Sequence, residues 1–160
     1  MTPATSTKHQ QILGELHGQL WQQLKKKKCK VFPAPFDVRF PSKSGEIEDE
    51  AIFTVVQPDI CIICDSKKID KKGCLGAPDL IIEILSLASA KRDVEEKYIL
   101  YQENGVKEYW IIHPNDQTAT VFFIENGKYK LHGIFAKESV VQSPFFEGNV
   151  IIDLNEVFEE

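Results

Sequence analysis

Apolar residues recur at helical spacing near the start of the chain. Ile12, Leu16 and Leu20 are four residues apart and therefore share one face of a helix. Ser6, a residue type that caps helix N-termini, stands shortly before this stripe. The pattern predicts an amphipathic helix over residues 5–24.

Short apolar runs, separated by proline, glycine and polar clusters, predict strands along most of the remaining chain. In chain order, we expect a strand at 29–40, an acidic loop at 41–51, a strand at 54–64, a charged turn at 65–73, a strand at 77–86, a helix at 90–105, a strand at 106–114, a hairpin at 118–135, a strand at 150–152 and a helical tail at 154–160. Asn126-Gly127 is the turn signal of the hairpin.

The central element of this pattern is the segment 77–86, which is apolar at almost every position. A continuous apolar run is typical of a strand that is covered on both faces. The order α-β-β-β-α-β-β-β predicts an α/β protein in which a mixed β-sheet is flanked by helices. Because the sequence contains no repeat and no linker, residues 1–160 are expected to form a single domain.

The charge of the chain limits the classes of function. A formal net charge of −5 and a pI of about 5.4 disfavour a protein that coats nucleic acid by bulk electrostatics. A metal-dependent nuclease is not excluded, because such an enzyme concentrates carboxylates and the bound ion reverses the local sign. The basic run Lys25–Lys28 has two interpretations, a solvated helix end or a patch that contacts phosphates.

No stretch approaches the roughly 18 apolar residues that span a bilayer, and the first residues lack the apolar centre of a signal peptide. We therefore expect a soluble, cytoplasmic protein with no membrane partner.

The cysteines and histidines give weaker signals. Four cysteines in a chain of this kind do not predict a disulfide framework. Cys61 and Cys64 resemble half of a zinc site, but strand residues three apart face opposite sides and Cys74 adds only a third ligand. Zinc is therefore disfavoured. His9 and His17 are expected on the surface of the first helix.

Two acidic residues on the apolar strands are candidates for chemistry. Glu83 stands within the apolar run 80–85, where a carboxylate is costly to bury unless it is paired or binds a metal. A neighbouring arginine or lysine would also satisfy it without any catalytic role. Asp59 follows Pro58 at the start of the preceding strand, where ordinary turn chemistry is the alternative explanation.

The strand arrangement makes these two residues a pair. If the strands at 58–64 and 79–85 are antiparallel, the start of the first faces the end of the second, so Asp59 lies near Glu83. Asp79 shares a face with Glu83 but lies roughly 13 Å away along the strand, too far to ligate the same ion. Asp59 and Glu83 are therefore the predicted metal ligands. Without the ion their repulsion should raise the pKa of at least one of them.

The order Pro-Asp followed by a buried strand that carries Glu resembles the PD-(D/E)XK nuclease superfamily. In particular, the chain is similar to the Uma-two family of restriction-endonuclease-like proteins. The residues that carry the resemblance are Ser6, Thr7 and His9, the run Pro35 to Val38, Pro58 and Asp59, the run Gly76 to Leu80, Glu83, Leu85 and Ser86, Arg92 and Asp93, Lys97, Tyr101, Gly105 and Val106, and the run Glu108 to Trp110. Each piece is weak alone, whereas the combination is specific.

The resemblance implies a restriction-endonuclease-like fold, a DNA substrate and a divalent cofactor, Mg²⁺ or Mn²⁺. By position, Asp59 and Glu83 are the metal carboxylates, and the backbone carbonyl of Ile84 is a further ligand. The superfamily places a lysine two residues after the glutamate, where this chain has Leu85. The resemblance therefore takes the lysine from the following helix, as Lys97.

Lys97 would orient or deprotonate the attacking water and stabilise charge on the phosphate. An ordinary helix ion pair with Asp93, four residues earlier, is the alternative explanation of Lys97. Asp93 and Asp79 are candidates for supporting positions near the site. Glu15, on the first helix, is a candidate for the helical acid that many of these nucleases carry.

The sequence therefore predicts a Mg²⁺-dependent endonuclease that hydrolyses phosphodiester bonds in DNA, with Asp59, Glu83 and Lys97 as catalytic residues. Two departures from the family pattern favour an alternative. The residues at 87–89 are Leu-Ala-Ser where Pro-Ser is more frequent, and His113 replaces an aspartate. The alternative is a catalytically silent protein of the same fold that acts as a binding or assembly module.

Two apolar features favour self-association. The hairpin Val121–Phe135 and the pair Phe145-Phe146 contain more apolar residues than the surface of a monomer needs. We therefore expect a homodimer.

Overall fold

The computed structural model describes residues 6–42, 53–86, 88–89, 91–146 and 148–160. Most of the acidic loop predicted at 41–51, and the first residue of each predicted long helix, at 5 and 90, lie outside the described residues. The helices are α1 (Thr7–Leu24), α2 (Lys91–Glu103) and α3 (Leu154–Val157), with a short 3-10 helix η1 (Ser66–Lys68). The strands are β1 (Lys30–Pro33), β2 (Val38–Pro41), β3 (Phe53–Val56), β4 (Ile60–Ile63), β5 (Ile69–Asp70), β6 (Gly73–Leu75), β7 (Leu80–Ile84), β8 (Glu108–His113), β9 (Thr118–Glu125), β10 (Lys128–Ala136), β11 (Val140–Gln142) and β12 (Ile151–Asp153).

The main sheet contains six of these strands in the order β1-β4-β7-β8-β9-β10. β4 and β7 are antiparallel neighbours, with Ile60 opposite Ile82, as the sequence predicts. β7 and β8 are parallel and are connected through α2, which makes a β-α-β crossover. A four-stranded sheet, β3-β2-β6-β5, and the pair β11-β12 accompany it. The predicted α/β class, a mixed sheet flanked by helices, is confirmed.

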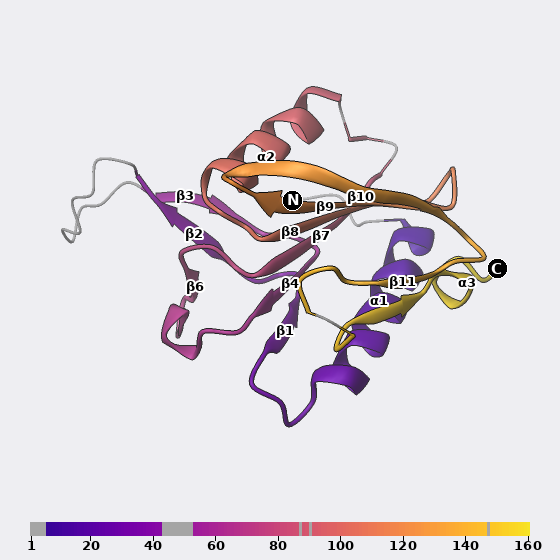
Figure 1. Ribbon diagram of the computed structural model, residues 1–160, viewed down its shortest axis with the longest axis horizontal. Helices are drawn as coiled ribbons and strands as arrows, with labels where there is room; N and C mark the ends of the chain where they lie inside the picture. Colours follow the sequence, from indigo (N-terminus) through magenta and orange to yellow (C-terminus); the bar gives the residue numbers. More distant parts are fainter. Residues whose placement is uncertain (1–5, 43–52, 87, 90, 147) are drawn as a thin grey trace.

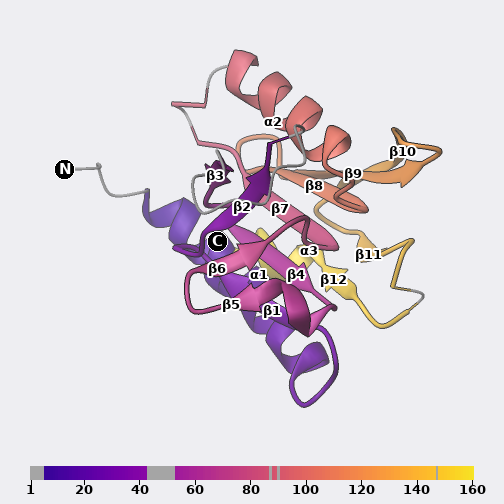
Figure 2. The ribbon, with the colours of Figure 1, turned by 90° about the vertical axis from the view of Figure 1, so that its left-hand side faces the viewer.

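Helices cover both faces of the main sheet because its central strands are apolar on both sides. Figures 1 and 2 show α2 over one face and α1 over the opposite face. Every residue of β7 is buried, with Ile82 and Ile84 in the core that α1 covers and Ile81 in the core that includes Tyr101 of α2. The two-residue period of a strand therefore assigns each side chain to one layer.

The predicted apolar stripe of α1 is buried against the sheet, and Ser6 caps the helix by accepting a hydrogen bond from the backbone N–H of His9 at 3.1 Å. The helix ends at Leu24, before the run of lysines. In the part of the chain that the structure describes, no helix combines the length and the apolar character that crossing a bilayer requires.

Two segments that the sequence predicts as single strands are each divided in the structure. Residues 29–40 form β1 and β2, and residues 54–64 form β3 and β4. In both cases one half enters the six-stranded sheet and the other half enters the four-stranded sheet. Pro35 and Pro58 lie in the interruptions, and a proline cannot donate to a strand ladder.

Cys29 and Cys64 form a disulfide, so the expectation that the cysteines are unpaired is wrong for these two. β1 and β4 are antiparallel, and their register makes Cys29 and Cys64 the next pair of facing positions beyond the strand ends. Cys61 and Cys74 are buried thiols. The disulfide occupies Cys64, which removes one ligand of the disfavoured zinc half-site.

A buried carboxylate outside the predicted site, Glu108, serves the fold. Its Oε1 accepts a hydrogen bond from Trp110 Nε1 at 2.9 Å, and its Oε2 accepts one from the Ser143 hydroxyl at 2.5 Å. These contacts connect β8 to the segment that precedes β12. Burial raises the pKa of Glu108, and the hydrogen bonds from Ser143 and Trp110 lower it by less.

Replacement of Glu108 by Gln should remove a pH dependence from the stability. The raised pKa favours the protonated form in the folded state. The free energy of unfolding of the wild type therefore falls as pH rises from the unfolded-state pKa, about 4.3, through the folded-state pKa, and is constant above it. Glu108→Gln lacks this loss, so its free energy of unfolding in urea, relative to that of the wild type, should rise with pH above about 4.3 and level off above the folded-state pKa of Glu108. Ser143→Ala, which keeps the carboxylate, is the control and should keep the pH dependence. A difference that does not change with pH would contradict this role of Glu108.

Candidate active site

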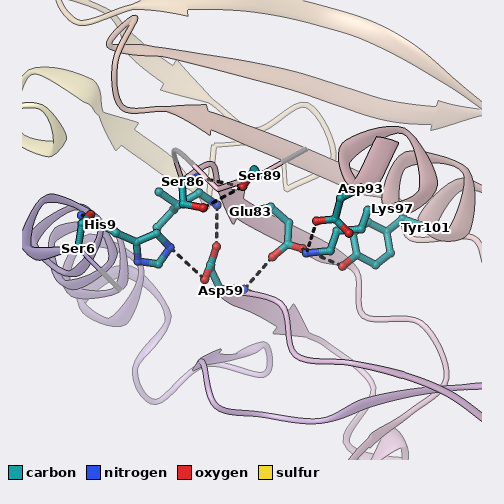
Figure 3. Close-up of polar contacts among 10 residues, drawn as sticks. Ser6, His9, Asp59, Glu83, Ser86, Ser89, Asp93, Lys97 and Tyr101 are labelled. Atoms are coloured by element: carbon teal, nitrogen blue, oxygen red, sulfur yellow. Dashed lines mark hydrogen bonds and ion pairs between the residues drawn. The ribbon is translucent and has the colours of Figure 1, made fainter. Parts of the chain in front are cut away.

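The antiparallel register of β4 and β7 brings Asp59 into contact with Glu83. The backbone N–H of Asp59 donates to Glu83 Oε1 at 3.0 Å, and the backbone N–H of Ile84 donates to Asp59 Oδ2 at 2.7 Å (Figure 3). The backbone at Asp59 therefore holds the Glu83 carboxylate, and the backbone next to Glu83 holds the Asp59 carboxylate. Glu83 is 5% exposed, whereas the side chain of Asp59 is 21% exposed. We call Asp59 and Glu83 the carboxylate pair; Asp59 is its more exposed member.

α2 supplies a cation and a hydroxyl group to the same pair. Lys97 Nζ lies 2.8 Å from Glu83 Oε2, and the Tyr101 hydroxyl donates to that oxygen at 3.0 Å. Lys97 and Tyr101 reach one acceptor because residues four apart share a helix face. Lys97 Nζ also lies 3.9 Å from Asp93 Oδ2. Lys97 therefore forms the ion pair with Asp93 and a closer one with Glu83, and its catalytic role stays a prediction.

α1 contributes His9 to the other side of the pair, which corrects the expectation that His9 lies on the helix surface. His9 is 5% exposed, and its Nε2 lies 3.4 Å from Asp59 Oδ1. Figure 3 shows the imidazole between α1 and Asp59. The sequence carried a signal for this position, because His9 precedes Ile12 by three residues and Leu16 by seven and so continues the buried stripe.

The pair is electrostatically asymmetric. Burial raises the pKa of Glu83, the Lys97 ammonium lowers it, and the Asp59 carboxylate raises it again. The predicted rise in pKa is therefore present at Glu83, but burial contributes more than repulsion. Burial lowers the pKa of Lys97, yet the attraction of Glu83, with smaller contributions from Asp93 and Asp59, raises it overall. Lys97 is therefore a charged ammonium beside a buried carboxylate.

The donor atoms of the pair suit a hard divalent cation. A carboxylate offers about four acceptor positions. Glu83 accepts contacts from three donors and Asp59 from two, so both keep acceptor capacity, and Asp59 keeps more. Mg²⁺ uses one or two carboxylates and retains several waters, and Mn²⁺ prefers the same oxygen donors. Among the described residues, no group of three or more His, Cys, Asp and Glu is arranged to hold a metal. The residues therefore fit Mg²⁺ or Mn²⁺ and do not fit a closed zinc site.

Two other predicted residues lie on β7 or at its start. Ile84 borders the pair through its backbone N–H, and the role of its carbonyl as a ligand stays a prediction. Asp79 precedes β7 at the end opposite the pair. Its Oδ2 accepts a hydrogen bond from the Cys64 backbone N–H at 2.7 Å, and its Oδ1 lies 3.4 Å from Lys107 Nζ. The structure therefore does not bring Asp79 to the pair.

Glu15, the predicted helical acid, also lies away from the pair. It follows His9 by six residues, which places it about 9 Å further along the axis of α1. Its Oε1 accepts a hydrogen bond from Gln19 Nε2 at 3.2 Å, and its charge acts on Glu156 of α3. The position that α1 presents to Asp59 is occupied by His9 instead.

A cavity of about 470 Å³ lies where the start of α1 meets the ends of β7 and β8. Its lining residues are Ser6, Lys8, Leu85, Ser86 and residues 113–116. Leu85 and Ser86 directly follow Ile84 in the chain, whereas Asp59, Glu83 and Lys97 are not among the lining residues. His113, which departs from the family pattern, belongs to this lining and not to the contacts of the pair.

Replacement of Lys97 by Met should destabilise the metal-free protein more in the wild type than in a Glu83→Gln background. In the wild type the change leaves a buried carboxylate without its cation, at a cost on the order of 1–3 kcal/mol. When Gln replaces Glu83, the uncompensated charge is absent and the same change should cost much less. Urea denaturation in EDTA of both single variants and the double variant measures this coupling. Additive effects would show that Lys97 and Glu83 are not a coupled pair.

Comparisons with known proteins agree with this fold. Residues 1–155 match the model of the Uma2 family, described as "Putative restriction endonuclease". Among solved structures, the chain is similar to a "putative nuclease belonging to DUF820" from Anabaena variabilis, with a TM-score of 0.72 and 20% identity over 99% of this chain and 84% of that chain. At this identity the likeness shows the fold alone. No curated protein matches the chain. Because the family model matches nearly the whole chain, the protein belongs to the Uma2 family, the Uma-two family that its motifs resemble.

Proposed function

We propose that the protein is a nuclease that hydrolyses phosphodiester bonds in DNA with the help of a divalent metal ion. One observation carries this proposal: Asp59 contacts Glu83 on the neighbouring strand, and Lys97 Nζ lies 2.8 Å from the same Glu83. Two carboxylates and a lysine at one point are the groups needed to hold a metal ion and a phosphate together. The description of the family supports the same activity.

Asp59 and Glu83 are the residues that would hold the ion, Asp59 through its more open carboxylate. The chemistry that a bound Mg²⁺ supplies is polarisation of a phosphoryl oxygen and acidification of a water molecule. Lys97 keeps a positive charge at the pair, where it would orient the attacking water and stabilise charge on the phosphate. Tyr101 fixes the orientation of Glu83, and His9 restrains Asp59.

The cavity lined by Ser6, Lys8, Leu85 and Ser86 is the proposed entrance for the phosphodiester. Its lining contains the Lys8 cation and the Ser6 and Ser86 hydroxyl groups, which are suited to phosphate oxygens. Acidic residues of the pair alone would repel a polyanion. A metal ion together with Lys8 and Lys97 reverses the sign of the site, which reconciles a net charge of −5 with a DNA substrate.

A catalytically silent member of the fold is the second candidate. The observation that favours it is the short contact between Lys97 and Glu83, which satisfies the buried carboxylate without a metal. Thermal stability in a titration of Mg²⁺ or Mn²⁺ distinguishes the candidates, because only a protein that binds the ion in its folded state is stabilised by it.

Glu83→Gln keeps the shape of the side chain and removes its charge, so it should abolish Mn²⁺-dependent cleavage of plasmid and single-stranded DNA. The variant should also lose most of the metal-induced rise in melting temperature while its metal-free fold is intact. Asp59→Asn should behave in the same way. Asp79→Asn is the matched control, because Asp79 directly precedes β7, the strand that carries Glu83. It should change cleavage and metal binding little, because Asp79 lies away from the pair.

The opposite result, in which Asp79→Asn loses metal binding and Asp59→Asn keeps it, would overturn the assignment of the pair. Cleavage that persists in EDTA would exclude the metal-dependent mechanism while leaving the nuclease activity itself in place.

We also propose that the protein forms a homodimer. Leu131 and Ile134 on the edge strand β10 are 54% and 64% exposed, and Phe145 is 41% exposed, whereas Phe146 is buried. An edge strand with apolar side chains is suited to association with another copy. Light scattering at micromolar concentration should give twice the chain mass of 18.2 kDa, and a mass near that of one chain would reject the dimer.

A further inference from the structure

The end of α1 that is remote from the carboxylate pair combines an exposed tryptophan with a run of lysines. Five of the six residues from 25 to 30 are lysines, and Trp21, one turn earlier, is 52% exposed. Trp21, Lys25, Lys26 and Lys30 line one cavity of about 120 Å³. Figures 1 and 2 both show the loop between α1 and β1 at the lower end of the molecule. We call Trp21 and residues 25–30 the lysine end.

The lysine end carries positive charge that the described part of the chain does not neutralise. None of the lysines at 25–28 and 30 forms an ion pair with a described carboxylate; Lys30 Nζ instead donates to the Lys27 carbonyl at 3.0 Å. Lys28 shares a second cavity with Lys67, Lys68 and Lys107, and these four lysines outnumber the two carboxylates of its lining, Asp65 and Asp79. A helix C-terminus is equivalent to about half a negative charge, so these cations exceed what it needs.

The lysine end is also held in place. The backbone N–H of Lys25 donates to the Trp21 carbonyl at 2.9 Å, and that of Lys27 donates to the Leu24 carbonyl at 3.0 Å. The disulfide between Cys29 and Cys64 joins this loop to the end of β4. A rigid arrangement loses less conformational entropy when it binds a ligand. The lysine end is therefore a preformed surface rather than a flexible basic tail.

We propose that the lysine end binds single-stranded nucleic acid, with a base stacked on Trp21 and phosphates held by Lys25, Lys26 and Lys30. An aromatic side chain flanked by cations suits a single strand, because an unpaired base exposes its π-face next to its phosphates. A lipid surface requires a broad apolar face, whereas the residues four positions before and after Trp21, His17 and Lys25, are polar. This interaction does not depend on cleavage: Trp21 follows His9 by twelve residues, about 18 Å along α1.

Tryptophan fluorescence tests the stacking directly. The chain has two tryptophans, of which Trp110 is 0% exposed, so quenching by a thymidine oligonucleotide in EDTA reports on Trp21. We expect quenching in the wild type. In fluorescence anisotropy with a labelled oligonucleotide, Trp21→Ala should weaken binding roughly 5- to 100-fold and Trp21→Phe should restore most of it. Unchanged binding in Trp21→Ala would overturn the proposal.

A matched pair of triple variants tests the lysines. Changing Lys25, Lys26 and Lys30 to Ala should weaken binding and lower the slope of log affinity against log salt by about 2, because each phosphate contact on a single strand contributes about 0.7. The control changes Lys128, Lys130 and Lys137 to Ala, which removes the same charge from β10 and the residue after it, and it should leave both quantities unchanged.

Three further outcomes would reject the proposal. They are equal weakening by both triple variants, which indicates bulk charge; no binding by the wild type; and quenching of Trp21 by phosphatidylserine vesicles and not by the oligonucleotide. Because the oligonucleotide is added in EDTA, the measurement does not require metal-dependent cleavage. A protein without nuclease activity therefore still gives a clear result in this test.

Discussion

The site depends on the burial of one carboxylate in the central strand of the sheet. Glu83 is 5% exposed and is stabilised by donors from two other elements, the Asp59 backbone N–H before β4 and the Lys97 and Tyr101 side chains of α2. A buried charge is tolerated only with such compensation. The same contacts therefore fix the register of β4 on β7 and the position of α2 on the sheet, so the fold and the site are determined together.

The sequence predicted the parts of the site that follow from strand geometry. Asp59 and Glu83 pair because β4 and β7 are antiparallel neighbours, so the start of one strand faces the end of the other. Lys97 came from the family resemblance, and the structure places it at Glu83, whereas the metal that these residues are proposed to hold stays a prediction. Tyr101 carried the resemblance too, but its hydrogen bond to Glu83 depends on how α2 docks.

The parts that sequence reasoning missed depend on position rather than on residue type. The sequence analysis expects His9 on the helix surface, although its spacing continues the buried stripe of α1. It expects Glu15 to be the helical acid of the site, although the spacing of Glu15 takes it away from Asp59. The disulfide between Cys29 and Cys64 depends on the pairing of β1 with β4. The two cysteines are 35 residues apart, so the sequence alone does not indicate that they are neighbours. Pro35 and Pro58 mark the interruptions of two predicted strands, but they do not show that the two halves enter different sheets.

α1 connects the two regions that we consider functional. Its first turn brings His9 to the carboxylate pair, its middle packs into the core, and its last turn presents Trp21 beside the lysines. An acidic chain thus separates its charges, with a carboxylate site at one end of a rigid helix and a cationic surface at the other. Under the two proposals above, this separation and the bound metal ion together reconcile the net charge of −5 with a polyanionic substrate.

Anomalous diffraction from crystals soaked in Mn²⁺ tests the central claim most directly. We predict one peak within about 2.0–2.6 Å of a carboxylate oxygen of both Asp59 and Glu83. A peak at Asp79, or no peak at the pair under saturating Mn²⁺, would contradict the account.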